Sequence, residues 1–332
     1  MTRNVLVTGG AGYVGSHACK ALFLAGYNPV TFDNLERGHH WAVKWGPLVR
    51  GSLSSTVDLD SCLKEYKPIA VMHFAALAYV GESVADPYRY YQNNVAGTLN
   101  LLDAMQKNLV DKLVFSSTCA TYGISQSIPI QETAPQFPIN PYGASKLMIE
   151  RVLQDARVLG LRSVVLRYFN AAGADQDCEI GECHIPETHL IPLILDVALG
   201  KRNSISIYGD DYDTPDGTCI RDYIHVADLV DAHVLALRHL LDGGASLSLN
   251  LGNGAGYSVK QVIETARRVT GHSIPVTIEP KRLGDPPILV GDSALARKLL
   301  GWNPSRADLE VQISDAWRWH CNLDQYATNS LK

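Results

Sequence analysis

The sequence has little of what membrane-spanning and nucleic-acid-binding proteins need. Its 332 residues include no run of about 18 apolar residues, the length that a membrane-spanning helix requires. Lys and Arg number 29 against 34 Asp and Glu, so the net charge is −5 and no basic footprint is present. These shortages exclude a membrane span and argue against a nucleic-acid partner.

The chain also lacks a disulfide framework and a leader. Its seven cysteines are odd in number and show no regular spacing. Met1 leads directly into an apolar segment, without the basic and apolar regions of a signal peptide. We therefore expect free thiols, a reducing environment and a cytoplasmic location.

Short apolar runs alternate with helical patterns through the first half of the chain. This alternation predicts an α/β fold with a doubly wound parallel sheet of the Rossmann type and helices on both faces. Strands are predicted at residues 5–8, 28–32, 68–76, 112–117 and 163–168, and helices at 13–25, 59–67, 93–107 and 141–159.

The pattern changes after Asn170. Residues 175–187 are polar and irregular, which indicates a loop. Helices are predicted at 190–199, 228–241 and 259–270, and a short strand at 204–208. We interpret 1–170 as a nucleotide-binding domain and 171–332 as a smaller α/β domain that faces the substrate. This boundary is soft, because later segments can return to the first domain.

A glycine-rich motif follows the first predicted strand. Gly9, Gly12 and Gly15 form a G-x-x-G-x-x-G pattern that leads into the first helix. Such glycines allow the backbone to approach a pyrophosphate, and the helix offers its N-terminal N–H groups. Asp33 ends the second strand, where an acid accepts hydrogen bonds from a ribose and favours NAD over NADP. The alternative is a plain turn with a surface acid, but the order of strand, glycines, helix, strand and acid favours NAD.

Tyr142 and Lys146 are i and i+4 neighbours on a helix that Pro141 is suited to begin. A nearby ammonium favours the phenolate and would lower the tyrosine pKa, and an oxidised nicotinamide would add a second positive charge. The pair could then take a proton from an alcohol while hydride leaves for the cofactor. Alone, the pair could equally be a surface contact.

Ser116 and Thr118 lie at the end of a predicted strand, where ligands bind in open α/β sheets. Thr118 could hydrogen-bond the reacting oxygen. The alternative is an ordinary serine/threonine turn.

Taken together, these motifs resemble the extended short-chain dehydrogenase/reductases and, among them, the UDP-glucose 4-epimerases. The resemblance covers nearly the whole chain, and the stretch around Arg221 is more specific than the glycine pattern. It is carried by Gly9–Gly15, Asp33-Asn34-Leu35, Phe74-Ala75-Ala76, Tyr142-x-x-x-Lys146, Tyr168-Phe169-Asn170, Pro186–Pro192, Asp216–Val226 and Arg282–Pro286.

The resemblance implies that Tyr142 removes the proton of the sugar 4-OH while hydride passes from C4 to NAD⁺. The 4-keto sugar then turns about its diphosphate bonds and takes the hydride back on its other face. Catalytic roles are implied for Tyr142, Lys146 and Thr118, and a homodimer is expected. The implied cofactor contacts are Gly9, Gly12, Tyr13, Val14, Gly15, Asp33, Asn34, Leu35, Ser52, Leu53, Phe74, Ala75, Ala76, Asn93, Ser116, Tyr142, Lys146, Tyr168 and Phe169. The implied UDP-sugar contacts are Thr118, Tyr142, Asn170, His189, Leu190, Tyr208, Arg221, Arg282, Asp285 and Leu289.

Several positions depart from the family pattern. Ser52 stands where many members have an Asp that reads adenine, and Ala78 where some place a lysine near the cofactor phosphates. Thr118 replaces a Ser but keeps the hydroxyl, and His189 replaces an Asn. Leu289 is intermediate between the bulky Tyr and the small residue that limit the sugar pocket in relatives.

Three other functions compete with the epimerase. A 4,6-dehydratase needs an Asp-Glu pair after the Thr that matches Thr118, and Cys119 and Ala120 stand there instead. A net oxidoreductase would release NADH, which the sequence does not address. A non-catalytic NAD-binding regulator conflicts with the intact Tyr142, Lys146 and Thr118. Glucose/galactose, N-acetylhexose and pentose sugar pairs all remain open, with glucose/galactose preferred.

Cys178, Cys183, His184 and His189 invite a zinc hypothesis, since cysteine and histidine are zinc ligands. Their spacing matches no closed zinc module, and the resemblance assigns this loop to nucleotide binding. We therefore expect no metal.

Overall fold

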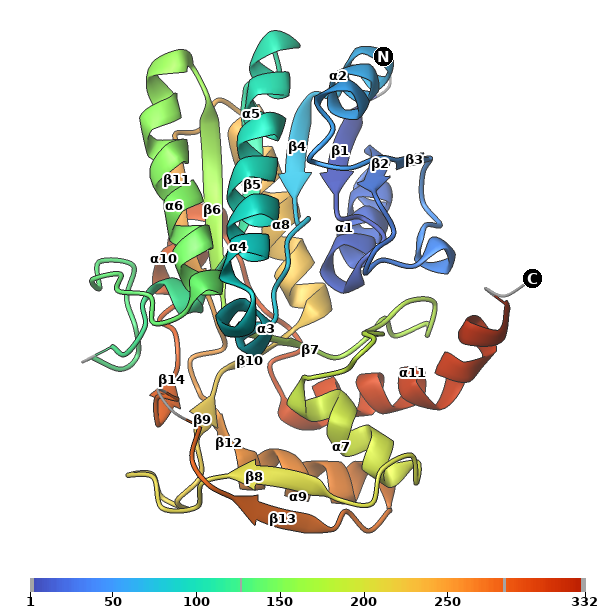
Figure 1. The fold of residues 1–332 in the computed structure, drawn as a ribbon, viewed down its shortest axis with the longest axis vertical. Helices are drawn as coiled ribbons and strands as arrows, with labels where there is room; N and C mark the ends of the chain where they lie inside the picture. The colour runs from blue at the N-terminus through green and yellow to red at the C-terminus, as the bar shows by residue number, and fades with distance from the viewer. Residues whose placement is uncertain (1–2, 126, 283–284, 330–332) are drawn as a thin grey trace.

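A seven-stranded sheet forms the upper part of the molecule (Figure 1). The computed structural model describes residues 3–125, 127–282 and 285–329. The strand order is β11-β6-β5-β4-β1-β2-β3, and every neighbouring pair is parallel, which confirms the predicted doubly wound fold. The strands are β1 (Asn4–Thr8), β2 (Asn28–Asp33), β3 (Leu48–Arg50), β4 (Ala70–His73), β5 (Lys112–Thr118), β6 (Arg162–Tyr168) and β11 (Leu247–Leu251).

Two layers of helices bury the two faces of this sheet. Since side chains alternate along a strand, Leu6 of β1 packs into one core while Val5 and Val7 pack into the other. The first core lies under α2 (Thr56–Tyr66), α5 (Gly97–Lys107) and α6 (Pro141–Asp155). The second core lies under α1 (Tyr13–Leu24), α8 (Val226–Leu241) and α10 (Ala294–Leu300).

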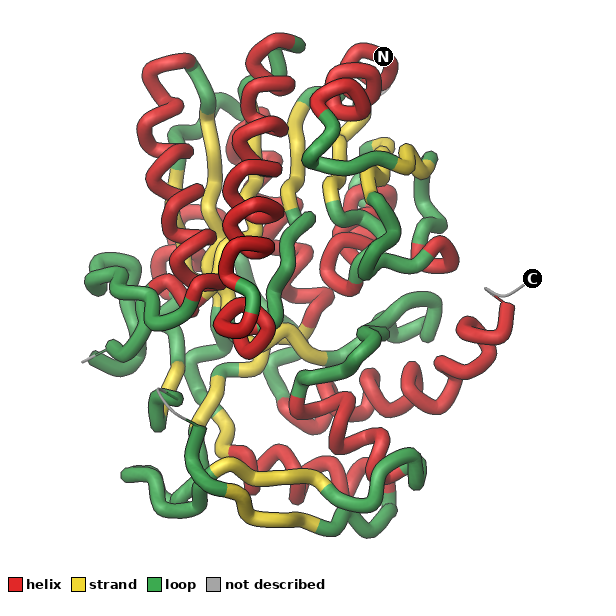
Figure 2. Tube along the Cα trace, viewed as in Figure 1, coloured by secondary structure: helices red, strands yellow, loops and turns green. Residues whose placement is uncertain are grey.

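Shorter strands and three longer helices form the lower part of the molecule (Figure 2). Its small sheets pair β7 with β10, β8 with β13, and β9 with both β12 and β14. The strands are β7 (Asn170–Ala172), β8 (Ile205–Tyr208), β9 (Ile220–Arg221), β10 (Tyr223–His225), β12 (Tyr257–Ser258), β13 (Val276–Glu279) and β14 (Ile288–Leu289). The helices are α7 (Leu190–Ala198), α9 (Val259–Thr270) and α11 (Leu309–Asn329), with the short α3 (Val80–Ala85) and α4 (Pro87–Tyr90) above them.

The chain returns to the large sheet after residue 170. Helix α8 and strand β11 join the upper part, and α10 packs on both of them. The division into residues 1–170 and 171–332 therefore stays a prediction with a soft boundary.

Most predicted elements are present, and several of their ends are shifted; helix α2, for example, begins at Thr56 and not at residue 59. Strand β4 stops at His73, because residues 74–76 leave the sheet as the loop at its carboxyl end. The helix predicted at 93–107 begins as a π-helical turn, Tyr91–Ala96, before α5. Helix α6 ends at Asp155, and a 3₁₀ turn, Ala156–Leu159, completes the predicted span.

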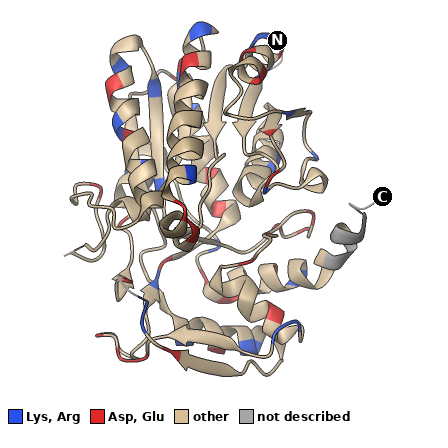
Figure 3. Ribbon diagram, viewed as in Figure 1, with Lys and Arg blue, Asp and Glu red and all other residues tan. Residues whose placement is uncertain are grey.

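Within the described residues, no helix is long and apolar enough to cross a membrane. Acidic and basic residues are interspersed along the described elements (Figure 3). All seven cysteines are free thiols, as expected.

Candidate active site

The glycine motif lies at the carboxyl end of β1, where the strand order reverses between β1 and β4. Ligands of doubly wound folds bind at such a switch point. A Cβ on Gly15 would lie 2.1 Å from the Gly9 carbonyl oxygen, and one on Gly9 would lie 2.6 Å from the Ala75 nitrogen. Gly9 also has a φ of +75°. A side chain at either position would therefore collide with backbone, so only glycine allows the tight turn, here called the glycine cradle, that a dinucleotide-binding loop requires.

Helix α1 begins inside this cradle. Gly12 is its N-cap and has no side chain to satisfy the first N–H groups, which are left for an anion. Val14 packs into the core beneath. The Tyr13 hydroxyl donates to the Gly173 carbonyl at 2.6 Å, so this tyrosine ties the motif to the chain that follows β7.

Asp33 ends β2 and is only 8% exposed. One carboxylate oxygen accepts the Ala11 N–H at 3.0 Å, and the other accepts the Leu35 N–H at 2.9 Å. Burial raises the pKa of Asp33, and these two N–H groups oppose that shift. Asp33 therefore shapes the glycine loop and the turn at Asn34 and Leu35, a role that the sequence did not reveal.

Ser52 lies beside an acidic residue that sequence reasoning missed. Its N–H donates to Asp58 at 3.2 Å, and its hydroxyl lies 2.8 Å from the Ser54 hydroxyl. Leu53 is buried, and its carbonyl accepts the Asn100 amide at 3.0 Å. Asp58 thus brings a carboxylate to the place where Ser52 departs from the family pattern.

The predicted Tyr–Lys pair lies on the first turns of α6. Asn140 caps this helix by accepting the Gly143 N–H at 2.8 Å. Lys146 is 4% exposed, and its ammonium donates to the Ser116 carbonyl at 2.8 Å. Burial lowers the pKa of Lys146 to about 7. The face of α6 that carries Tyr142 and Lys146 therefore lies against the carboxyl end of β5.

Tyr142 differs from the expectation in its proton affinity. The sequence predicted a pKa lowered by Lys146, but burial raises the pKa of Tyr142, and a hydrogen bond with Thr118 only partly opposes the rise. The physical reason is that burial removes water from the charged phenolate and makes it less stable, which raises the pKa. The Lys146 side chain donates to the Ser116 carbonyl instead. That prediction was wrong for the protein alone, where Tyr142 is a neutral phenol.

The remaining predicted cofactor residues line the ends of β4, β5 and β6. The Tyr168 hydroxyl lies 2.6 Å from the Ser116 hydroxyl, and Phe169 is 8% exposed. Phe74, Ala75 and Ala76 form the loop after β4. Asn93 lies in the π-helical turn and donates to its neighbour Asn94 at 2.9 Å.

Asn94 itself was not predicted, yet it connects three elements. It exchanges hydrogen bonds with both backbone groups of Leu77 at 2.9 Å, and it donates to the Ser145 hydroxyl on α6 at 3.1 Å. A π-helical turn often marks a functional site, which is the one signal that could have found it.

A buried ion pair supports the Tyr–Lys helix from below. Glu150 lies one turn after Lys146 and receives Arg167 of β6 at 2.6 Å, with both side chains under 5% exposed. Arg167 also donates to the Tyr122 hydroxyl at 2.8 Å, and Ser117 donates to Glu150. Nothing in the sequence pairs these distant residues.

The predicted nucleotide residues gather on short strands below the sheet. Arg221 lies on β9 and forms an ion pair with Asp285. Strand β14 pairs with β9, which places Leu289 beside Arg221. The Asn170 side chain donates to the Asp222 carbonyl at 3.2 Å. The structure thus brings these predicted residues together from segments that are more than fifty positions apart along the chain.

Leu289 also lies next to the cofactor side of the site. It packs against the buried cluster that includes Phe169, together with Cys119, the residue after Thr118. The Arg221 charge acts on the Cys119 thiol and favours its anion, although burial raises the pKa of that thiol to about 12. These contacts bring the substrate strands to the end of β5.

Two groups of predicted residues lie at the edges. The Arg282 guanidinium stacks over the Tyr208 ring at 3.8 Å from its centroid. Leu283 and Gly284 of the same motif lie outside the described residues. His189 caps the start of α7 and contacts Glu182 and Glu187, and Leu190 begins the helix and packs into the lower core.

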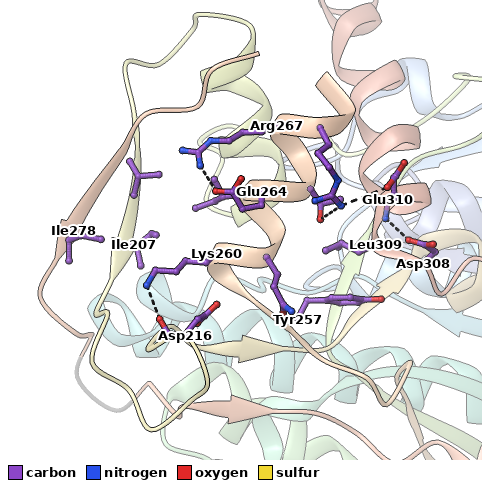
Figure 4. A pocket seen from close by; sticks show the side chains of 15 residues that line it. Ile207, Asp216, Tyr257, Lys260, Glu264, Arg267, Ile278, Asp308, Leu309 and Glu310 are labelled. Carbon is purple, nitrogen blue, oxygen red and sulfur yellow. Dashed lines mark hydrogen bonds and ion pairs between the residues drawn. The ribbon is translucent and has the colours of Figure 1, made fainter. Parts of the chain in front are cut away.

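A separate pocket of about 720 Å³ contains none of the predicted residues (Figure 4). It lies between α9, the β8–β13 pair and the start of α11, and the labelled side chains of Tyr257, Lys260 and Glu310 border it. Two acidic and several basic groups along it are already paired, including Arg267 with Glu264.

The sheet, the glycine cradle and the Tyr–Lys pair define a dinucleotide-binding enzyme that acts on an alcohol or a ketone. The chain belongs to the NAD-dependent epimerase/dehydratase family, whose model matches residues 5–252. This confirms the family that the motifs around Gly9, Tyr142 and Arg221 predicted, and NAD as its cofactor.

Similar proteins span the full chain. A UDP-glucose 4-epimerase of Rhizobium leguminosarum bv. trifolii is 53% identical over 97% of this chain and 98% of its own length. The crystal structure of the Brucella ovis UDP-glucose 4-epimerase in complex with NAD superposes with a TM-score of 0.94 at 51% identity, covering 96% of this chain and 99% of that one. The Bifidobacterium longum enzyme in complex with NAD⁺ and UDP gives a TM-score of 0.92 at 37% identity, covering 97% and 99%.

Proposed function

We propose that this protein is a UDP-glucose 4-epimerase that interconverts UDP-glucose and UDP-galactose with tightly bound NAD. The observation that carries the proposal is the placement of Tyr142, Thr118 and Lys146 around the end of β5, with Cys119 and Ala120 next in the chain. Neither Cys119 nor Ala120 can serve as the carboxylic acid that a dehydratase needs. The three similar proteins named above support the same assignment.

The cradle fits a dinucleotide. Gly9 and Gly15 let the loop pack tightly before α1, the uncapped start of α1 suits a pyrophosphate, and Asp33 suits a ribose. When bound, NAD supplies the hydride acceptor and donor for the sugar C4, and it ends each turnover oxidised.

Tyr142 exchanges the proton of the sugar 4-hydroxyl in this proposal. Burial keeps its phenol neutral in the protein alone, so it needs a positive charge nearby to become a base. An oxidised nicotinamide would carry that charge, so Tyr142 would act as a base only when the oxidised cofactor is bound. Thr118 holds the reacting oxygen, and Lys146, fixed on Ser116, positions the cofactor side of the site.

The nucleotide would be held by the lower strands while the sugar turns. Arg221 and Arg282 suit the diphosphate through charge-assisted hydrogen bonds, and Tyr208 suits the uracil. Asn170, His189, Leu190 and Asp285 complete the proposed set. Leu289, packed beside Phe169, would limit the space in which the hexose rotates.

The test is a panel of UDP-sugars supplied to the purified protein, with product ratios measured by chromatography. We expect the highest kcat/KM for the glucose/galactose pair. A higher kcat/KM for the N-acetylhexose or the pentose pair would replace the glucose/galactose assignment, and no C4 inversion of any UDP-sugar would refute the epimerase.

The enzyme is further proposed to be a cytoplasmic homodimer. Helices near the site expose Val84, Tyr88, Leu99 and Met148, which would be covered by a second subunit. The free thiols are in keeping with a reducing compartment. Light scattering of the purified protein tests the dimer, and a monomer at micromolar concentration would refute it.

A further inference from the structure

Four side chains converge in the loop that leads into α7. Glu182, His184, Glu187 and His189 each direct one ligand atom to a common place, and these atoms all lie within 4.8 Å of one another. The His189 Nδ1 atom lies 2.8 Å from Glu182 and 2.9 Å from Glu187. The His184 Nδ1 atom lies 3.2 Å and 3.4 Å from the same two carboxylates.

These distances match the edges of a small tetrahedron. A Zn²⁺ ion binds imidazole nitrogen and carboxylate oxygen at about 2.0–2.2 Å, so two ligand atoms on one ion are about 3.3 Å apart. One Glu182 oxygen lies 3.2 Å from His184 and 2.8 Å from His189, whereas Glu187 meets His184 with one oxygen at 3.4 Å and His189 with the other at 2.9 Å. The set therefore needs only a small expansion to hold one ion at its centre.

The His184 nitrogen gives a second, independent indication. Its Nδ1 atom is buried and has no hydrogen-bond partner, although the Glu182 carboxylate is only 3.2 Å away. A buried polar atom without a partner is costly unless something else binds it. The His184 nitrogen and the Glu182 carboxylate are therefore better placed to bind one ion between them than to form a hydrogen bond with each other. Two carboxylates also offset the charge of one divalent cation, with both imidazoles neutral.

A neighbouring acidic group provides the contrast. Asp175, Asp177 and Glu179 also converge, but the Lys20 ammonium lies among them at 2.7 to 3.2 Å. That group already has its cation in the form of a side chain. The Glu182–His189 group contains no lysine or arginine at its centre, only the two imidazoles.

We propose that Glu182, His184, Glu187 and His189 form a structural Zn²⁺ site. This site differs from the one weighed in the sequence, because Cys178 and Cys183 are not among the converging ligands. The proposal goes beyond the epimerase function and does not depend on it. It uses only the Nδ1 atom of His189, so the Nε2 atom is left for the nucleotide contact proposed above.

The position of the site indicates what the ion would do. The His184 ring packs edge-on against Tyr13 of the glycine motif and against Tyr79. His189 is the N-cap of α7, and its side chain makes no capping hydrogen bond. An ion there would fasten the start of the substrate helix to the cofactor loop, as a positioning element without contact to the reacting atoms.

The test measures metal on the full chain. The purified protein is stripped with a chelator, incubated with ZnSO₄ alone, passed through a desalting column and assayed by mass spectrometry for zinc per chain. The wild type is expected to retain one zinc. His184→Asn and Glu187→Gln are expected to retain at least about tenfold less zinc per chain. Losing a metal ligand should weaken zinc binding at least as much as losing a residue that only supports a ligand.

Two control variants separate this site from others. Cys183→Ser lies between two proposed ligands, and His272→Asn removes an exposed histidine of α9's C-terminal loop. Both are expected to keep one zinc, and loss in Cys183→Ser would overturn the ligand set. Failure of the wild type to retain zinc, or equal retention in His184→Asn, would overturn the site itself.

A spectrum of the wild type decides the case in which the ligand variants do not fold. Co²⁺ in a tetrahedral site of nitrogen and oxygen ligands gives strong visible absorption, which we expect on adding CoCl₂ to the stripped protein. A colourless protein under these conditions would overturn the proposal.

Discussion

The upper and lower parts of the site hold their functional groups in opposite ways. The proton-transfer groups lie at the ends of long, buried strands, where Lys146 is 4% exposed and Ser116 is 5% exposed. The nucleotide groups lie mostly on short strands of two to four residues and on loops, where Tyr208 is 39% exposed. The chemistry therefore depends on groups that cannot move, whereas recognition depends on groups that a ligand can still order.

The largest expected effect comes from the rigid part. Tyr142→Phe removes the proposed proton acceptor and should lower kcat about 10³-fold, within the usual range for loss of general acid–base catalysis. UDP affinity, measured by calorimetry, should stay unchanged, because the nucleotide residues are on other strands. Tyr66→Phe, on the last residue of α2 and away from the carboxyl ends of the strands, is the control and should keep full activity. More than a tenth of wild-type kcat in Tyr142→Phe would contradict this role.

The second effect concerns the support under the catalytic helix. Arg167→Met leaves Glu150 buried without its partner, which should reduce the free energy of unfolding by about 3–5 kcal/mol. Urea denaturation measures the loss. Arg151→Met removes an exposed pair with Asp155 on the same helix and should change stability little. Equal losses in the two variants would show that burial of the Glu150 pair is unimportant.

The third effect tests the flexible part. Arg221→Ala removes a charge-assisted contact to the proposed diphosphate, which should weaken UDP binding about 10- to 100-fold. The fold should persist, because the contacts of Arg221 stay within the small β9–β14 region: it forms an ion pair with Asp285 and donates to the carbonyls of Ile220 and Pro287. Arg297→Ala, an exposed arginine on α10, is the control. Unchanged UDP affinity in Arg221→Ala would place the diphosphate elsewhere.

The smallest effect is a pH slope from Lys146. Its pKa falls to about 7 in the folded protein, while the unfolded chain keeps the ordinary value of 10.5. Between these values the unfolded chain binds the extra proton, so the stability of the wild type rises with pH. Compared with Lys146→Met, the cofactor-free wild type should gain up to about 1.4 kcal/mol per pH unit between pH 7 and 9. A difference that does not change with pH would mean that Lys146 stays charged.

The same contrast explains what the sequence could predict. Motifs that are contiguous, such as Gly9–Gly15 and Tyr142–Lys146, follow from the alternation of strands and helices, and the structure places them as the fold requires. Strands β9, β12 and β14 have two residues each and leave no periodic signal. Their pairing depends on contacts between distant segments.

Long-range contacts also account for the missed residues. The Glu150–Arg167 pair joins helix α6 to strand β6 and forms only when the helix packs on the sheet. Asp58 is only six positions from Ser52 and meets it through the turn before α2, which periodicity does not reveal. For the protein alone the pKa of Tyr142 was predicted with the wrong sign, because burial, a property of the folded chain, raises it.

The most direct test of the epimerase is conversion without added cofactor. The purified protein, with only the NAD that it carries, is given UDP-glucose or UDP-galactose in large excess, and both C4 epimers and the NADH absorbance are followed. We expect both reactions to reach the same ratio of epimers after many turnovers, with no lasting rise in NADH. NADH that accumulates in step with product, or conversion that stops after one turnover, would contradict the epimerase.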